Sequence, residues 1–168
     1  MSAFLDEIGV CIPALRRYAR SLTRDASRAD DLVQDCLERA IRKQALWRAS
    51  GTVKSWLFKM LLNLYRNELR RDRRAGTDRI EDIDRELSVA PSQPGRIAFV
   101  EIAHAVDALP ADQREALLLV VLEGCSYAEA AAILDIVPGT LMSRLGRARE
   151  NLRRMTDRVD EVKLRTVK

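Results

Sequence analysis

Arginines are the residues of this chain whose type and spacing point to a chemistry, and that chemistry is contact with a polyanion. Five of them crowd one predicted helix near the C-terminus: Arg144, Arg147, Arg149, Arg153 and Arg154. Glu150 is the only acid among them. A second basic run, RNELRRDRR, occupies residues 66–74. Two separate basic surfaces indicate a nucleic acid that the protein contacts at two places.

The distribution of charge supports the same interpretation. Residues 1–74 hold 16 Lys and Arg against 9 Asp and Glu, whereas residues 75–98 hold 3 against 5 and residues 99–168 hold 10 against 11. The formal net charge of +4 is therefore the sum of a basic N-terminal half, an acidic middle and a nearly balanced C-terminal part.

Enzyme chemistry has no support in the sequence. His104 is the only histidine, and it has no Ser, Cys or metal-ligand partner at a usable spacing. Cys11, Cys36 and Cys125 are far apart and show neither a disulfide framework nor the spacing of a metal site. We therefore expect no catalytic site, no metal and no cofactor. The N-terminus has acids where a signal peptide would carry basic residues, and no apolar run reaches the length of a membrane span, so we expect a soluble cytoplasmic protein.

Helices must position these residues, because glycine, proline and aromatic residues are few. Apolar residues keep a helical period from Phe4 to Leu22, with Pro13 either bending this segment or starting its second half. Asp25 or Ser27 can cap a second helix, and Thr52 can cap a third one that ends in the basic run. Residues 75–96 lack periodicity, are acidic and end in a proline-containing stretch, which is typical of a flexible linker.

The C-terminal part contains the clearest local signal. Helices are predicted from about Ile97 to Leu109 and from Pro110 to Glu123, where Gly124 ends the second one. Ser126 and Glu129 form a capping box that opens a short helix to Leu134.

After a tight turn at 135–137, a helix begins at Pro138 or Gly139 and repeats apolar residues at Leu141, Leu145, Ala148 and Leu152. Arginines oppose that stripe, so the pair of helices predicts a helix-turn-helix. The expected fold class is all-α, with two small helical domains joined by the linker. The function stays open at this point between a self-sufficient helix-turn-helix regulator, a helical adaptor that binds only protein, and a promoter-recognition subunit.

Three segments resemble one family. LPADQREALLLVVLEGCSYAEAAAILDIVPGTLMSRLGRARENL is similar to the C-terminal promoter-binding domain of extracytoplasmic-function sigma factors. ADDLVQDCLERA and SWLFKMLLNLYRNELRR resemble the two signature helices of the N-terminal domain of that family. The resemblance implies an RNA polymerase sigma factor that binds the β′ clamp and the β subunit of core polymerase and directs transcription from specific promoter DNA.

The resemblance also implies roles for residues. A first group would dock on the β′ clamp of core polymerase: Asp31, Leu32, Gln34 and Asp35. A second group would bind the minus-ten promoter element: Trp47, Thr52, Lys59, Asn63, Arg66, Arg70 and Arg71. Holding an extruded base requires a pocket with hydrogen-bonding groups, a stacking surface and cations along the strand, which this group provides.

The minus-thirty-five element would bind to the helix-turn-helix. Thr140, Ser143, Arg144 and Arg147 lie opposite the apolar stripe and are expected to face the major groove, while Arg153 would contact phosphate. The implied domains are residues 1–74 and 97–168, with 75–96 as the linker.

Within the family, APSQPGRIAFVEI and LPADQREALLLV look most like the alphaproteobacterial general-stress-response subgroup. That likeness implies control by an anti-sigma protein, which we expect to clamp the two tethered domains together.

Overall fold

The computed structural model describes residues 2–47, 51–76 and 94–166, and the regular structure in these ranges is entirely helical. This confirms the all-α prediction. The first part of the chain contains α1 (Ser2–Thr23), α2 (Ala26–Arg42), the short 3-10 helix η1 (Gln44–Leu46) and α3 (Val53–Arg74). The second part contains α4 (Pro94–Asp107), α5 (Ala111–Leu117), the π-helical turn η2 (Leu118–Leu122), α6 (Tyr127–Leu134) and α7 (Pro138–Thr166).

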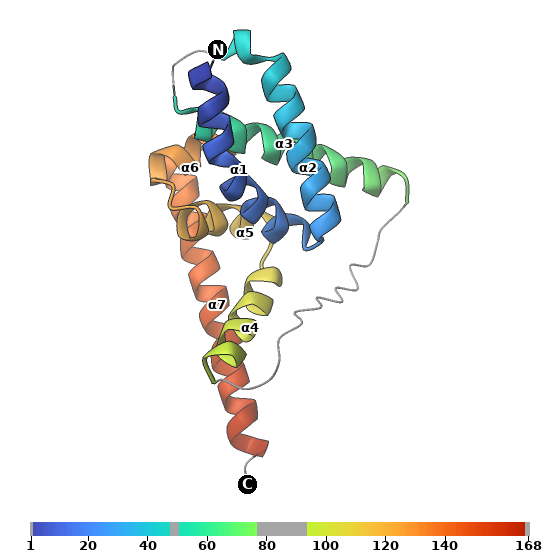
Figure 1. The fold of residues 1–168 in the computed structure, drawn as a ribbon. Helices are drawn as coiled ribbons and strands as arrows, with labels where there is room; N and C mark the ends of the chain where they lie inside the picture. The colour runs from blue at the N-terminus through green and yellow to red at the C-terminus, as the bar shows by residue number, and fades with distance from the viewer. Residues whose placement is uncertain (1, 48–50, 77–93, 167–168) are drawn as a thin grey trace.

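Helices α1, α2 and α3 pack on one another as an N-terminal unit (Figure 1). Their apolar stripes meet in a core that includes Tyr18, Leu22, Cys36, Leu57 and Phe58, all with no exposed surface. Burying stripes of this size is the main stabilising contribution to such a bundle. Helix α1 continues through Pro13, whose side chain is exposed.

The predicted helix starts are confirmed by their caps. The carboxylate of Asp25 accepts a hydrogen bond from Arg28 N at 2.9 Å, and Thr52 Oγ1 accepts one from Ser55 N at 3.1 Å. These bonds satisfy backbone donors that the first turn of a helix leaves unpaired.

The C-terminal unit contains the predicted helix-turn-helix, α6 and α7 (Figure 1). Its capping box is complete, because Ser126 N donates to Glu129 Oε2 at 2.8 Å and Glu129 N donates to Ser126 Oγ at 3.2 Å. Asp135 ends α6 in the left-handed conformation, with φ of 58°, and turns the chain toward α7. Gly124 ends the preceding helical segment with φ of 63°, as its sequence position predicts.

Two details differ from the sequence-based expectation. The helix predicted from Pro110 to Glu123 is α-helical only to Leu117, after which the π-helical turn η2 widens the backbone. Helix α4 starts at Pro94, three residues before the predicted start at Ile97, so it takes in the last part of the predicted linker. Residues 77–93 of that linker lie outside the described residues.

The two units pack directly on each other, an arrangement that the sequence did not predict. Helix α6 lies against α3, and η2 lies against α1 (Figure 1). The buried residues of both units form one continuous cluster, from Ile8 in α1 to Ala148 in α7. The C-terminal part of α7 extends away from the N-terminal unit beside α4 (Figure 1).

Candidate nucleic-acid and polymerase interfaces

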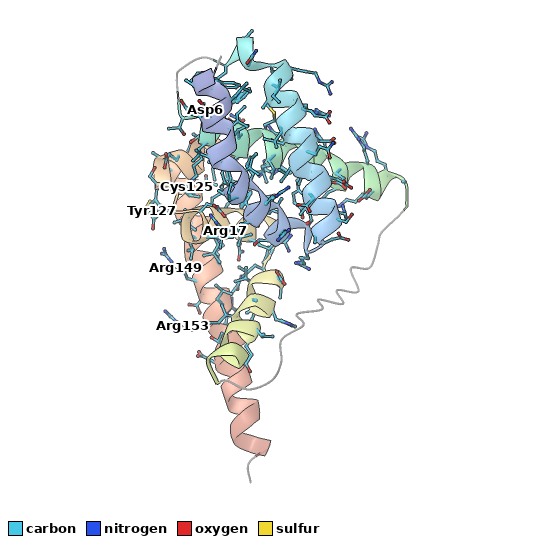
Figure 2. The ribbon with its side chains drawn as sticks, in the orientation of Figure 1. Asp6, Arg17, Cys125, Tyr127, Arg149 and Arg153 are labelled. Carbon is cyan, nitrogen blue, oxygen red and sulfur yellow. The ribbon has the colours of Figure 1, made fainter. Side chains whose placement is uncertain are left out.

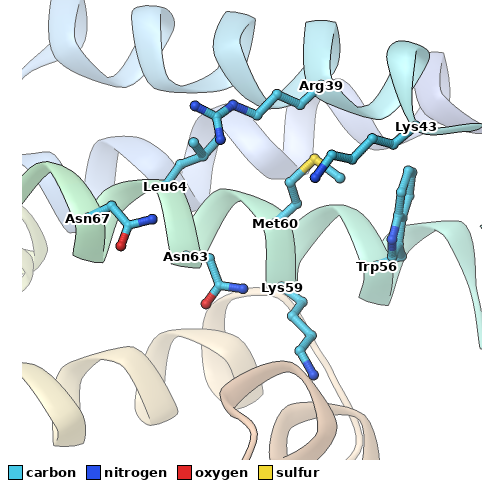
Figure 3. A pocket seen from close by; sticks show the side chains of 8 residues that line it. All are labelled: Arg39, Lys43, Trp56, Lys59, Met60, Asn63, Leu64 and Asn67. Carbon is cyan, nitrogen blue, oxygen red and sulfur yellow. The ribbon is translucent and has the colours of Figure 1, made fainter. Parts of the chain in front are cut away.

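A cavity of about 490 Å³ lies between α2 and α3, at the predicted minus-ten surface. Figure 3 shows the eight side chains that line it: Arg39, Lys43, Trp56, Lys59, Met60, Asn63, Leu64 and Asn67. Three are cations, two are amides, and Met60, Leu64 and Trp56 provide apolar surface. Cations attract phosphate, amides hydrogen-bond base edges, and an indole is a surface on which a base can stack. The cavity therefore has the groups needed to hold a single-stranded nucleotide.

The structure brings together two of the predicted minus-ten residues here, Lys59 and Asn63, and adds residues that the sequence analysis missed. Arg39 and Lys43 come from the end of α2 and face α3 across the cavity (Figure 3). Their spacing of four residues places them on one helix face, so the sequence alone could have predicted a basic patch at the end of α2. Only the packing of α2 on α3 shows that this face adjoins Asn63.

The other predicted minus-ten residues have different surroundings. Trp47 is half-buried, and the centroid of its ring lies 5.6 Å from that of Phe4. The Phe4 ring also packs near Trp56, with 6.2 Å between the two ring centroids. The Thr52 hydroxyl caps α3. Residues 48–50 of the predicted recognition loop lie outside the described residues.

Arg66 points toward the C-terminal unit. Its guanidinium makes two bonds to the carboxylate of Glu115, at 3.3 and 2.6 Å, and these bonds raise the pKa of Arg66 above its ordinary value. Arg70 and Arg71 are exposed on the following turns of α3. The predicted basic surface therefore consists of two exposed arginines, Arg70 and Arg71, and one arginine, Arg66, that is paired with Glu115.

The predicted polymerase-docking residues lie on α2. Asp31, Gln34 and Asp35 are exposed, whereas Leu32 is 5% exposed and packs in the core. Gln34 donates a hydrogen bond to Glu38 at 3.3 Å, which extends the polar row by one turn. Leu32 therefore supports this face from inside, and the other three side chains can contact a partner.

Helix α7 presents the predicted minus-thirty-five residues with its apolar stripe turned inward. Leu141, Leu145 and Ala148 are buried, and three predicted contact residues on the opposite side are exposed: Thr140, Ser143 and Arg147. Arg144 is mostly covered, with 21% of its side chain exposed, and its Nε lies 3.5 Å from Asp112 Oδ2.

Arg153 is exposed and lies 3.6 Å from Glu150, one turn earlier on the same helix. Arg149 donates to the Tyr127 hydroxyl at 3.3 Å, so a tyrosine and an arginine not predicted as contacts join this surface. Tyr127, Arg149 and Arg153 follow one edge of the molecule along α6 and α7 (Figure 2). The sequence could have indicated Tyr127, because it directly follows the capping Ser126 and so lies at the start of the helix-turn-helix.

Gly146, in the middle of α7, makes no close contact, since a Cβ built at this position meets nothing within 4 Å.

The cysteines are buried thiols, and burial raises the pKa of Cys36 to about 12, which keeps it protonated and unreactive. Within ranges 2–47, 51–76 and 94–166, no group of His, Cys, Asp and Glu side chains could hold a metal, and no helix could span a membrane.

Comparisons with known proteins identify the domains that the two units resemble. The sigma2 domain of PhyR matches residues 8–62, and region 4 of sigma-70 matches residues 99–152. The structure is similar to the sigma factor RpoE of Bartonella quintana, solved in complex with the anti-sigma factor NepR, with a TM-score of 0.79 and 35% identity. That likeness covers 94% of this chain and 98% of RpoE.

Two relatives cover most of the chain. ECF RNA polymerase sigma factor SigM of Mycobacterium tuberculosis is 33% identical over 141 residues, which are 84% of this chain and 70% of SigM. ECF RNA polymerase sigma factor EcfG of Rhodopseudomonas palustris is 42% identical over 147 residues, or 88% of this chain and 81% of EcfG. At this identity, over most of both chains and with both domain models matched in order, the protein belongs to the ECF family of RNA polymerase sigma factors.

Proposed function

We propose that the cavity between α2 and α3 holds an unstacked base of the minus-ten promoter element while core RNA polymerase is bound. The observation that carries this proposal is the convergence of Lys59, Asn63, Arg39 and Lys43 around one cavity of about 490 Å³. Arg70 and Arg71 continue the basic surface along α3 and would follow the displaced strand. Trp56 offers the stacking surface, while Trp47 and Thr52 would hold the recognition loop in place.

Helix α7 would recognise the minus-thirty-five element in the major groove. Thr140, Ser143 and Arg147 are exposed for contact with base edges, and Arg153 for contact with phosphate. Arg144 would join them after leaving Asp112, which lies 3.5 Å away. The domain limits that follow are 1–74 for core binding and minus-ten recognition and 97–168 for minus-thirty-five recognition.

Asp31, Gln34 and Asp35 would dock on the β′ clamp of core polymerase. They form an exposed polar row on α2, and Leu32 anchors that row from the core. The chain would act in the cytoplasm, where the polymerase is, and would have no catalytic activity of its own.

The partner that restrains this sigma factor would be a small anti-sigma protein, and the setting would be a stress response. Support comes from the likeness to RpoE, which was solved bound to NepR, and from the resemblance of 90–102 to the stress-response subgroup. If the inhibitor contacts both domains, lengthening the tether between Arg79 and Pro94 should weaken its binding at least about tenfold, because effective concentration falls as a linker grows. An inhibitor that binds one isolated surface would show no such dependence.

The test is in vitro transcription with purified core polymerase on duplex templates randomised upstream of the start site. With the chain present, sequenced transcripts should share an asymmetric two-element motif, and without it they should not. A repressor or activator that acts alone would instead select a two-fold site in the absence of polymerase. Membership of the sigma family does not favour that alternative or a protein-binding adaptor.

A further inference from the structure

Two neighbouring residues of α7 are not explained by packing or by helix stability. Met142 is a large apolar residue that is 59% exposed. Gly146 lies one turn further along the helix, where a Cβ would meet nothing within 4 Å. Alanine would therefore fit at position 146, and alanine favours a helix interior more than glycine does. Single exposed apolar side chains are common on proteins, so what sets Met142 apart is its position beside this glycine.

Both residues lie on the side of α7 that faces away from the core. The inward stripe of this helix is buried and consists of Leu141, Leu145 and Ala148. At about 100° per residue, Gly146 lies roughly 60° around the helix from Ser143 and roughly 40° from Met142. The two residues therefore adjoin the side chains that we propose to enter the major groove.

Met142 lies at the end of α7 that is suited to base contact. It belongs to the first two turns of the helix, which begins at Pro138. In a helix-turn-helix the N-terminal residues of the second helix contact base edges. Arg149 and Arg153 are exposed further along the same side, and Arg149 donates to the Tyr127 hydroxyl at 3.3 Å (Figure 2). Such cations suit phosphate, so Met142 lies where the bases, and not the backbone, would pass.

The missing side chain at Gly146 leaves space beside Met142. Helical side chains lean toward the N-terminus, so each one covers the turn that precedes its own Cα. A side chain at position 146 would therefore cover the surface next to Met142. With glycine there, Met142 borders uncovered helix backbone. The methionine side chain is unbranched and flexible, so it can close against an apolar group that enters this space.

The major groove of DNA offers one apolar group to such a surface. Thymine carries a C5 methyl group on its groove edge, whereas the other groups that the bases present there are hydrogen-bond donors and acceptors. The thioether of Met142 is only a weak acceptor, so it is poorly suited to those polar groups. The chemistry of this position therefore favours the thymine methyl group.

We propose that Met142 recognises the C5 methyl group of one thymine in the minus-thirty-five element, and that Gly146 keeps open the space that this methyl group enters. The inference rests on the proposed binding of α7 in the major groove. It makes Met142 a specificity-determining residue in a site that otherwise consists of hydroxyls and arginines. Thymine and uracil differ only in this methyl group, so a single replacement in the DNA tests the contact.

The test uses holoenzyme reconstituted from the full chain and core polymerase, with duplex promoter fragments of the sequence that the wild-type holoenzyme selects. Each thymine of the minus-thirty-five element, on either strand, is replaced in turn by deoxyuridine, and fluorescence anisotropy measures the affinity. One replacement should weaken binding of the wild type about fourfold, the factor expected for burying one methyl-sized group. Met142→Ala should bind the thymine and uracil duplexes equally well.

Three further variants show whether the contact depends on this side chain and on the space beside it. Met142→Leu keeps a flexible apolar side chain and should keep most of the thymine preference. Ile102→Ala is the matched control, because it removes an apolar side chain of similar exposure, 52%, from α4, and it should keep the full preference. Gly146→Ala should reduce the preference, because the added methyl group occupies the space. The same variant should raise the melting temperature of the free chain by about 2 to 4 °C.

Three results would overturn the proposal. A wild-type thymine preference in Met142→Ala would exclude Met142, and the same result in Gly146→Ala would overturn the role of Gly146. If deoxyuridine has no effect at any position, or if the selected element contains no A·T pair, no methyl group is recognised. Failure of the α7 site itself would look different, because whole base-pair changes in the element would then leave wild-type binding unchanged, and Arg147→Ala would leave selectivity unchanged.

Discussion

The α2–α3 cavity and the exposed face of α7 are the two proposed nucleic-acid sites of this chain, and they are built in different ways. The cavity takes Arg39 and Lys43 from one helix and Lys59 and Asn63 from another, so it exists only when the two helices pack. The contact residues predicted for α7 all lie on a single helix, and helical periodicity places them on one face. A site assembled from two elements can enclose a base, whereas a site on one helix can enter a groove of intact duplex.

The largest expected effect tests whether the cavity encloses a base. Asn63→Ala should reduce transcription from duplex promoters by tenfold or more, because extruding a base costs a few kcal/mol that the cavity has to offset. Open complexes are measured by permanganate footprinting with core polymerase. A template melted in advance over the minus-ten element should recover much of the activity, and equal defects on both templates would place Asn63 outside base capture.

The next effect tests the claim that α7 recognises intact duplex. Arg147→Ala should relax preference at one upstream base, worth about 1 to 3 kcal/mol of discrimination, because an arginine that binds guanine through two bonds is lost. Selection of randomised upstream sequences with the reconstituted holoenzyme measures this preference. Arg153→Ala is the comparison variant and should weaken all sequences alike. Unchanged selectivity in Arg147→Ala would remove it from base recognition.

Polymerase docking should be separable from both DNA sites. Asp35→Arg reverses a charge on the exposed face of α2 and should weaken binding to core polymerase by about tenfold, or roughly 1.4 kcal/mol. Fluorescence titration of core enzyme with labelled chain measures this affinity. Glu38→Arg changes a residue about one turn further along α2, and its affinity for core polymerase shows whether the docking surface extends that far. A wild-type affinity in both variants would move docking away from this face.

The smallest effect concerns the local element that starts the helix-turn-helix. Ser126→Ala should lower the free energy of unfolding by about 1 kcal/mol, the usual loss for an N-cap serine, and should leave minus-ten opening unchanged. Bonds from Ser126 hold the pKa of Glu129 below its ordinary value of 4.5. The stability from this carboxylate is therefore complete above about pH 4.5 and is lost as the pH falls through the lowered pKa.

Chemical denaturation at pH 7 and pH 3.5 measures this pH effect. Glu129→Gln should show a smaller loss of stability between the two pH values than the wild type. The same loss in both proteins would assign the acid sensitivity to other carboxylates.

Local signals in the sequence predicted the capped helix starts and placed the proposed α7 contacts on one helix face. The caps at Asp25 and Thr52, the capping box at Ser126 and the alternating apolar steps after Gly139 depend on neighbours within one or two turns. Such short-range patterns need no knowledge of the tertiary fold. The same reasoning placed Lys59 and Asn63 on one basic helix.

Only the tertiary structure decided what lies across from each helix. It brought Arg39 and Lys43 of α2 to Asn63, buried Leu32 beneath the docking face, and paired Arg66 with Glu115, 49 residues away. These outcomes depend on how two apolar faces pack and on which charges then meet, and no periodicity within a single helix specifies either. Helical pattern determined which residues share a face, and long-range packing determined which faces share a site.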